Sequence, residues 1–121
     1  MKATRPCVFV FCKDEDSDYL SEVLSGIEEE GVPFLVEHRE GSLDELAFLA
    51  AKESTLGAGI GIVGEEAAMQ MASLPLGRNV FEIKQPSLSA YRRLGMNCAR
   101  AFKRRPFLPL EKEPSEEGAQ G

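Results

Sequence analysis

The 121-residue sequence contains no tryptophan, one histidine and three cysteines. The odd number of cysteines excludes a complete disulfide framework, and Cys7, Cys12 and Cys98 show neither a C-x-x-C pair nor the spacing of zinc ligands. We therefore expect all three to be reduced and buried. His38 has no cysteine or serine motif beside it in the sequence, so we interpret it as a structural or surface residue.

Long apolar runs are also missing. The longest, residues 8–12, is far shorter than the roughly 20 residues that span a bilayer, and the N-terminus lacks the apolar region of a signal peptide. These absences predict no membrane segment and a cytoplasmic location. With 43% hydrophobic and 28% charged residues, the composition is that of one soluble globular domain.

Positive charge is scarce outside one segment. The formal net charge of −6 opposes the broad positive field that nucleic-acid binders present to phosphate, so we expect no nucleic-acid partner. Residues 91–105 nevertheless hold a group of cations and no acidic residue. We interpret these cations as a solvated helix face, and a local basic patch is the alternative. They are Arg92, Arg93, Arg100, Lys103, Arg104 and Arg105.

Hydrophobic periodicity predicts alternating strands and helices. The predicted strands are residues 6–13, 33–40, 58–64 and 79–85, and the predicted helices are residues 19–30, 42–54, 65–74 and 86–105. Because right-handed crossovers leave few other arrangements, we expect one α/β domain over residues 1–105, with a twisted, mainly parallel sheet of four strands and helices on its faces. This topology is similar to anticodon-binding domains. Residues 106–121 are rich in proline and charge, and we expect a mostly disordered tail in which only 107–110 docks.

The stretch GAGIGIVG, residues 57–64, contains a G-x-G-x-x-G pattern. A dinucleotide loop needs its glycines after a completed strand, whereas the residues between these glycines are the apolar residues of the strand itself. The two glutamates that follow would also repel a phosphate. Gly57, Gly59 and Gly61 alternate with larger residues, which predicts a bare strand face that a helix or a partner's backbone can approach closely.

Three consecutive carboxylates, Glu28, Glu29 and Glu30, end the first predicted helix just before Gly31. They are unfavourable with the helix dipole and with one another, each by a few tenths of a kcal/mol to about 1 kcal/mol. The triplet is either a solvated helix end or a place where a cation or a partner's arginine compensates. Because one carboxylate binds a divalent ion weakly, a metal here would need oxygen ligands from another chain.

Four segments, in this order, resemble the small (beta) subunit of the diol and glycerol dehydratase-reactivating factors. The resemblance covers about residues 20–102 and departs from the family pattern in the acidic loop at residues 14–18 and in the tail. The matching segments are GIEEEGVPF, LAAKESTLGAGIGI, ASLPL and YRRLGMNCARAF.

The resemblance implies a non-catalytic subunit that pairs with a large subunit bearing an actin-like ATPase domain. In that family, the complex acts like a chaperone: it releases damaged cobalamin from an inactivated B12-dependent diol or glycerol dehydratase, through an exchange of the small subunit with a similar dehydratase subunit. ATP chemistry would belong to the large subunit. Members work in the cytoplasm, often beside bacterial microcompartments.

The resemblance also assigns a site. It places the glutamate two residues before the glycine of GVP, here Glu29, at a divalent metal such as magnesium that is shared with the large subunit. The neighbouring Glu28, Glu30, Gly31 and Val32 would then lie at the partner interface. No cofactor of the chain's own is implied. An interface exposed in the isolated subunit also allows homodimerisation.

Three other functions compete with this assignment. The chain could be a subunit of the dehydratase itself, although the corresponding dehydratase subunit is longer. It could be an RNA-binding module, because its predicted topology is similar to anticodon-binding domains and its last helix is basic. A small nucleotide-dependent enzyme is disfavoured by the position of the glycines.

Overall fold

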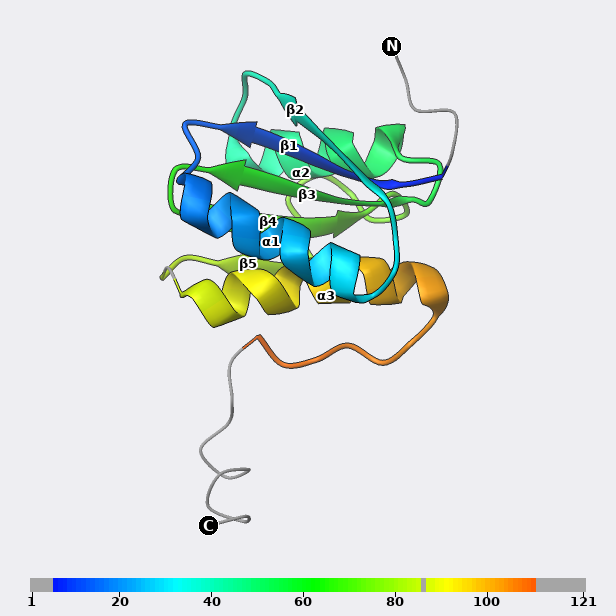
Figure 1. Cartoon of the computed structure of the whole chain (residues 1–121). Coiled ribbons are helices and arrows are strands. Elements are labelled where there is room, and N and C mark those ends of the chain that lie inside the picture. The colour runs from blue at the N-terminus through cyan, green and yellow to red at the C-terminus, as the bar shows by residue number, and fades with distance from the viewer. Residues whose placement is uncertain (1–5, 86, 111–121) are drawn as a thin grey trace.

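One mixed sheet with helices on both faces makes up the fold (Figure 1). The computed structural model describes residues 6–85 and 87–110, and these residues form five strands and three helices. In chain order, the elements are β1 (Val8–Lys13), α1 (Ser17–Glu29), β2 (Phe34–His38), α2 (Leu43–Glu53), β3 (Ala58–Val63), β4 (Glu66–Met71), β5 (Phe81–Ile83) and α3 (Leu88–Lys103). The prediction of a single α/β domain is confirmed.

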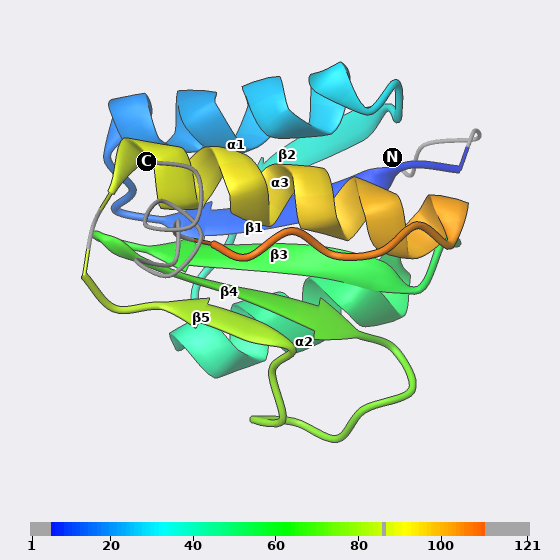
Figure 2. The same ribbon diagram turned by 90° about the horizontal axis from the view of Figure 1, so that it is seen from below.

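The strand order is β2-β1-β3-β4-β5. Strand β1 pairs in parallel with β2 and β3, whereas β4 pairs antiparallel with β3 and β5. Helices α1 and α3 lie side by side on one face of the sheet, and α2 covers the other (Figure 1, Figure 2). The predicted four-stranded, mainly parallel sheet is therefore wrong: the described residues contain one more strand, and the sheet is mixed.

The error lies at residues 65–74, where a helix was predicted and β4 is found. Gly64, at φ 60°, and Glu65 form a two-residue turn that pairs Val63 with Glu66, which is the geometry of a tight hairpin. The Tyr91 hydroxyl donates a hydrogen bond to the Glu65 carbonyl and holds this turn. Alanine, methionine and glutamate favour helices, but pairing with β3 and β5 overrides that weak preference.

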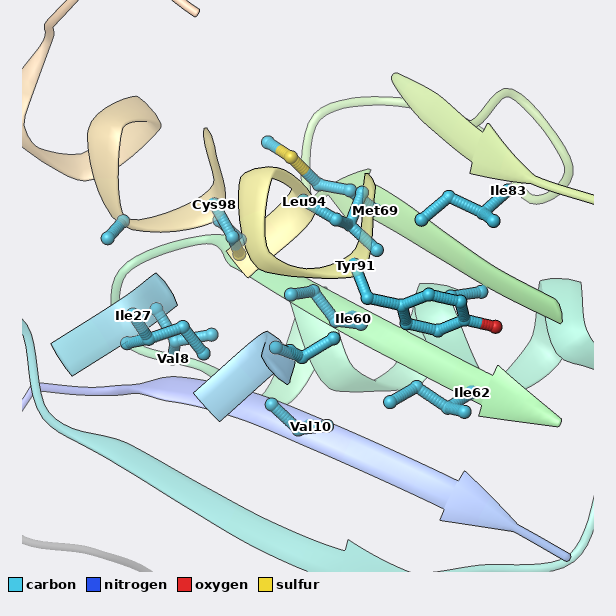
Figure 3. Close-up of a cluster of buried hydrophobic side chains, with 14 of the residues drawn as sticks. Val8, Val10, Ile27, Ile60, Ile62, Met69, Ile83, Tyr91, Leu94 and Cys98 are labelled. Carbon is cyan, nitrogen blue, oxygen red and sulfur yellow. The ribbon is translucent and has the colours of Figure 1, made fainter. Parts of the chain in front are cut away.

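Two hydrophobic clusters lie on opposite faces of the sheet. In the larger one, Tyr91, Leu94 and Cys98 of α3 pack with Ile60 of β3 and Met69 of β4 (Figure 3). The smaller one lies under α2. Its buried members are Cys7, Phe9, Phe11, Leu46 and Ala50. Strand β1 supplies side chains to both clusters, which confirms the prediction of a fully buried strand, and the three cysteines are buried as expected.

Helices α1 and α3 approach each other almost at backbone contact. A Cβ atom added to Gly26 would overlap the Arg92 carbonyl, and one added to Gly95 would overlap the Val23 carbonyl. The two helices run in the same direction. Tyr19 stacks on Tyr91 near their N-termini, and Glu30 contacts Arg100 near their C-termini. This packing brings the acidic end of α1 beside the basic end of α3.

After α3, residues 106–110 lie along that helix. Asn97, which is fully buried, donates a hydrogen bond to the Leu108 carbonyl at 2.8 Å and accepts one from the Leu108 amide at 2.6 Å. The predicted disorder of residues 111–121, and the predicted place of Pro86 in the first turn of the last helix, lie outside the described residues. Among residues 6–85 and 87–110, no helix combines the length and apolar character needed to cross a membrane.

Candidate partner interface

The candidate site is the C-terminal end of α1 and the turn after it. The Gly31 amide donates to the Glu28 carbonyl and the Val32 amide donates to the Ile27 carbonyl, which together form a Schellman cap. Gly31 adopts φ 75°, a left-handed conformation that glycine takes without strain. The sequence signal GVP therefore ends the helix as expected and fixes the position of the three preceding carboxylates.

The three glutamates have different environments. Glu28 and Glu29 are exposed, whereas Glu30 is 7% exposed. Of the other residues assigned to the interface from the sequence, Gly31 is exposed and Val32 is buried. In this conformation, Glu28, Glu29 and Gly31 are available to a partner, and the side chains of Glu30 and Val32 point into the protein.

Glu29 shares an arginine, Arg92, with Glu22, which lies two turns earlier in the same helix. Arg92 Nη1 lies 2.9 Å from Glu29 Oε2, and Arg92 Nε lies 2.9 Å from Glu22 Oε1. The hydrogen bond to Glu22 and the charges of both carboxylates raise the pKa of the Arg92 guanidinium. The Glu29 side chain remains 47% exposed, so it is held by the arginine and still open to solvent.

Glu30 is surrounded by cations from the end of α3 and from the residues just after it. Arg100 Nε lies 3.0 Å from Glu30 Oε2, and Arg105 Nη1 lies 3.4 Å from Oε1. Lys103 Nζ donates to the Glu30 backbone carbonyl at 2.7 Å, and this hydrogen bond satisfies a carbonyl that has no partner within the helix. Cations of the same chain thus compensate two of the three carboxylates that are unfavourable in the sequence, Glu29 and Glu30.

The interpretation of the basic segment as a solvated face is wrong for Arg100, whose side chain is only 16% exposed. Arg100 and Arg93 also donate hydrogen bonds to the carbonyls of Pro106 and Pro109, so they hold the segment after α3 as well. Sequence reasoning identified the acidic triplet and the basic helix but did not connect them. Seventy residues separate Glu30 from Arg100, and only the close packing of α1 on α3 joins them.

The exposed end of α1 offers part of a metal site. A carboxylate oxygen suits a hard cation such as Mg²⁺, and Glu28 and Glu29 both expose one. In the described part of the chain, Glu29 does not belong to any group of three or more potential ligands. A divalent ion here would therefore need further oxygen ligands from outside this domain, and it would compete with Arg92 for Glu29.

A shallow groove adjoins this end of α1. Its volume is about 330 Å³, and it lies between the outer face of α1 and the edge strand β2. Its lining is mixed, with serine hydroxyls beside half-buried apolar side chains. The lining residues are Ser17, Leu20, Ser21, Leu24, Ser25, Glu28 and Phe34. Glu28 thus belongs both to the acidic end and to a recess that a partner's side chains can fill.

The glycine pattern does not form a phosphate loop. Gly59 and Gly61 lie within β3, and added Cβ atoms there would overlap the backbone of α2 at Ala50 and Ala47. The predicted close approach of a helix to the bare strand face is confirmed for these two glycines. Gly57 differs, because it precedes the strand and adopts φ 74° in a turn.

Comparison with known proteins gives a consistent result. Residues 5–108 match a family model described as Dehydratase medium subunit. The chain is 36% identical over 107 residues to the propanediol dehydratase-reactivating factor small subunit of Citrobacter freundii, which covers 86% of this chain and 91% of the relative. It is 33% identical over 114 residues to the diol dehydratase-reactivating factor small subunit of Klebsiella michiganensis, and the match covers 93% of this chain and 91% of the relative.

The chain belongs to the family of dehydratase-reactivating factor small subunits. Solved structures agree with this assignment. A diol dehydratase-reactivating factor complexed with ADP and Mg²⁺ contains a chain that matches with a TM-score of 0.80 at 32% identity, covering 88% of this chain and all of the other. A glycerol dehydratase reactivase matches with a TM-score of 0.83 at 28% identity and the same coverage. The resemblance seen in the sequence is confirmed.

Proposed function

We propose that this small-subunit family member works with a large ATPase subunit to reactivate a B12-dependent diol or glycerol dehydratase. The observation that carries the proposal is 33–36% identity to reactivating-factor small subunits over most of both chains. The complex would release damaged cobalamin so that intact coenzyme can enter. We assign this work to the cytoplasm, in association with a bacterial microcompartment.

In this account the chain itself is non-catalytic, and the large subunit binds and hydrolyses ATP. The position of the glycine pattern supports this division of roles, because Gly59 and Gly61 face α2 and leave no room for a nucleotide. The reactivating factor that matches this fold was found with ADP and Mg²⁺. We assign the corresponding nucleotide to the partner of this chain.

Subunit exchange accounts for the match to a dehydratase subunit model. A small subunit with the fold of a dehydratase subunit can take that subunit's place on a shared partner, so similarity to Dehydratase medium subunit supports an exchange. Nucleotide state in the large subunit would decide which of the two is bound. When the large subunit is absent, the same exposed surface would allow this chain to form a homodimer.

The end of α1 is the surface we assign to the large subunit. Glu29 would supply one oxygen to a magnesium ion completed by the partner, and Glu28 and Gly31 would contact the partner directly. Exposure of all three residues and the adjoining groove support this assignment. Glu30 and Val32 would act indirectly, by holding the turn that presents Glu29.

Binding to the large subunit at fixed magnesium tests the interface. We expect Glu29→Gln to weaken the complex by at least about tenfold, because a metal ligand is lost. Glu22→Gln is the matched control: it removes the same charge from the same helix and the same arginine, but lies outside the assigned surface. Undiminished affinity in Glu29→Gln would remove the metal-bridging role.

RNA binding is less well supported. Of the cations on α3, Arg92 and Arg100 are bound to carboxylates of α1, which lowers the positive field available to phosphate. The likeness to anticodon-binding domains remains a prediction. A titration with RNA over a salt series decides this alternative, because phosphate binding weakens steeply with salt and we expect no such binding.

A further inference from the structure

A second group of potential ligands lies away from the end of α1, at the carboxyl ends of β1 and β2. Cys12 and His38 are register partners in this parallel pair, so their side chains project from the same face of the sheet. Glu15 follows two residues after β1. The thiol, the imidazole and the carboxylate each offer one ligand atom, and these atoms lie within 4.8 Å of one another.

The backbone explains how Glu15 reaches the two strands. Asp14 adopts φ 53°, a left-handed conformation that is uncommon outside glycine, and this turns the chain directly after β1. Asp16 then caps α1 through hydrogen bonds from the amides of Asp18 and Tyr19. Glu15 is thus fixed between a strand end and a helix start, and its Oε2 lies 2.7 Å from His38 Nε2.

The spacing is close to that of a metal centre. In a tetrahedral zinc site with bonds of about 2.0–2.3 Å, ligand atoms lie roughly 3.3–3.8 Å apart, so small side-chain movements would bring these three into place. A sulfur, a nitrogen and an oxygen ligand together suit zinc better than magnesium. The site therefore differs in chemistry from the carboxylate surface at the end of α1.

The three side chains differ in their exposure to solvent. Cys12 is fully buried, the Glu15 side chain is 14% exposed, and the His38 side chain is 69% exposed. A pocket of about 230 Å³ beside the cluster gives solvent access to His38, and its lining residues are Cys12, Lys13, Asp14, His38, Arg39 and Glu40. The charges around this pocket are mixed, because Asp14 and Glu40 line it together with Lys13 and Arg39.

We propose that Cys12, Glu15 and His38 bind one zinc ion at this end of the sheet. Without metal, the Cys12 thiol lies 3.7 Å from the Glu37 carbonyl and donates to it, while His38 pairs with Glu15. Zinc binding replaces the thiol proton, which passes to solvent, with a sulfur–zinc bond, and it replaces the His38–Glu15 hydrogen bond with bonds from each side chain to the metal. The ion would tie β1, β2 and the start of α1 together.

Titration of the full, reduced chain with zinc alone against a chromophoric chelator tests the proposal. We expect one zinc per chain, and at least about tenfold weaker binding in His38→Gln and in Cys12→Ala. Glu40→Gln is the control, since Glu40 lines the same pocket but is not one of the three ligands. Cobalt substituted for zinc should give a sulfur-to-metal charge-transfer band that Cys12→Ala loses.

His38→Gln keeps the test decisive if the buried Cys12 substitution disturbs folding, because the His38 side chain is at the surface. No binding of zinc by the wild-type chain, or binding that His38→Gln leaves unchanged, would overturn the proposal. Neither result depends on the large subunit, so the outcome is separate from that of the proposed function.

Discussion

Arg100 Nε lies 3.0 Å from Glu30 Oε2, and this contact joins the basic end of α3 to the acidic end of α1. The two helices run in the same direction on one face of the sheet, so their dipoles repel and their C-terminal carbonyls lie at the same end (Figure 2). Cations on α3 offset both the carboxylates and the carbonyls of α1. The ion pair is therefore part of what holds the proposed partner surface in shape.

Glu30→Gln should destabilise the fold. The substitution leaves Arg100, whose side chain is 16% exposed, without its buried carboxylate. Loss of one partner of a buried pair costs about 3–5 kcal/mol. Because Lys103 and Arg105, the other two cations at Glu30, are more exposed, we expect a loss of about 2–3 kcal/mol in the free energy of unfolding. Urea unfolding measures the change. Glu28→Gln, an exposed neighbour, should change stability by less than about 0.5 kcal/mol, and equal losses in both variants would contradict this role of Glu30.

Gly61→Ala should destabilise the sheet and α2 together. A Cβ at Gly61 would lie 2.5 Å from the Ala47 backbone nitrogen, so either the strand or the helix must move. We expect a loss of about 2–3 kcal/mol in the free energy of unfolding. Glu66→Ala, on the neighbouring strand and exposed, should change it by less than about 0.5 kcal/mol. A neutral Gly61→Ala would contradict the close packing of α2 on β3.

Asn97→Ala should release the segment after α3. Asn97 makes both hydrogen bonds to the Leu108 backbone from a fully buried position, so its removal leaves a donor and an acceptor unpaired. We expect a loss of about 1–2 kcal/mol and much faster hydrogen exchange at the Leu108 amide. Arg93→Ala removes a more exposed contact, to the Pro109 carbonyl, and should leave that amide protected. Continued protection in Asn97→Ala would show that the segment is held in another way.

Arg92→Gln should change the affinity for the large subunit while changing the stability of the fold only slightly. The ion pairs of Arg92 are partly exposed, so we expect less than about 1 kcal/mol of destabilisation. If magnesium binds Glu29 at the interface, removal of the competing guanidinium should strengthen the magnesium-dependent complex with the large subunit by about three- to tenfold. Calorimetric titration at fixed magnesium measures this change. Weaker binding would indicate that Arg92 itself contacts the partner.

Local signals in the sequence were sufficient for most of the fold. The capping box of Ser42 and Glu45 is present, Gly31 ends α1, and β1 is buried on both faces. Residues 65–74 were misassigned because their helix-favouring side chains are held in β4 by pairing with β3 and β5, and no short-range pattern reports that pairing. Gly64 was the available signal, since glycine as the first residue of a two-residue turn indicates a hairpin.

The sequence was less informative about the sites. It identified Glu29 through a family resemblance and identified the cations of α3 through composition, but contacts between residues 63 to 75 positions apart decide which carboxylate is exposed and which is buried. His38 is a surface residue as expected. No sequence motif predicts that His38 lies close to Cys12 and Glu15, because the pairing register of β1 and β2 brings these residues together.

The most direct test of the proposed function is recovery of dehydratase activity. An inactivated diol or glycerol dehydratase is incubated with the large subunit, ATP, magnesium, intact coenzyme and this chain, and a parallel reaction omits the chain. The proposal predicts that activity returns only when the chain is present. No recovery under conditions in which a known reactivating factor restores the same enzyme would contradict it.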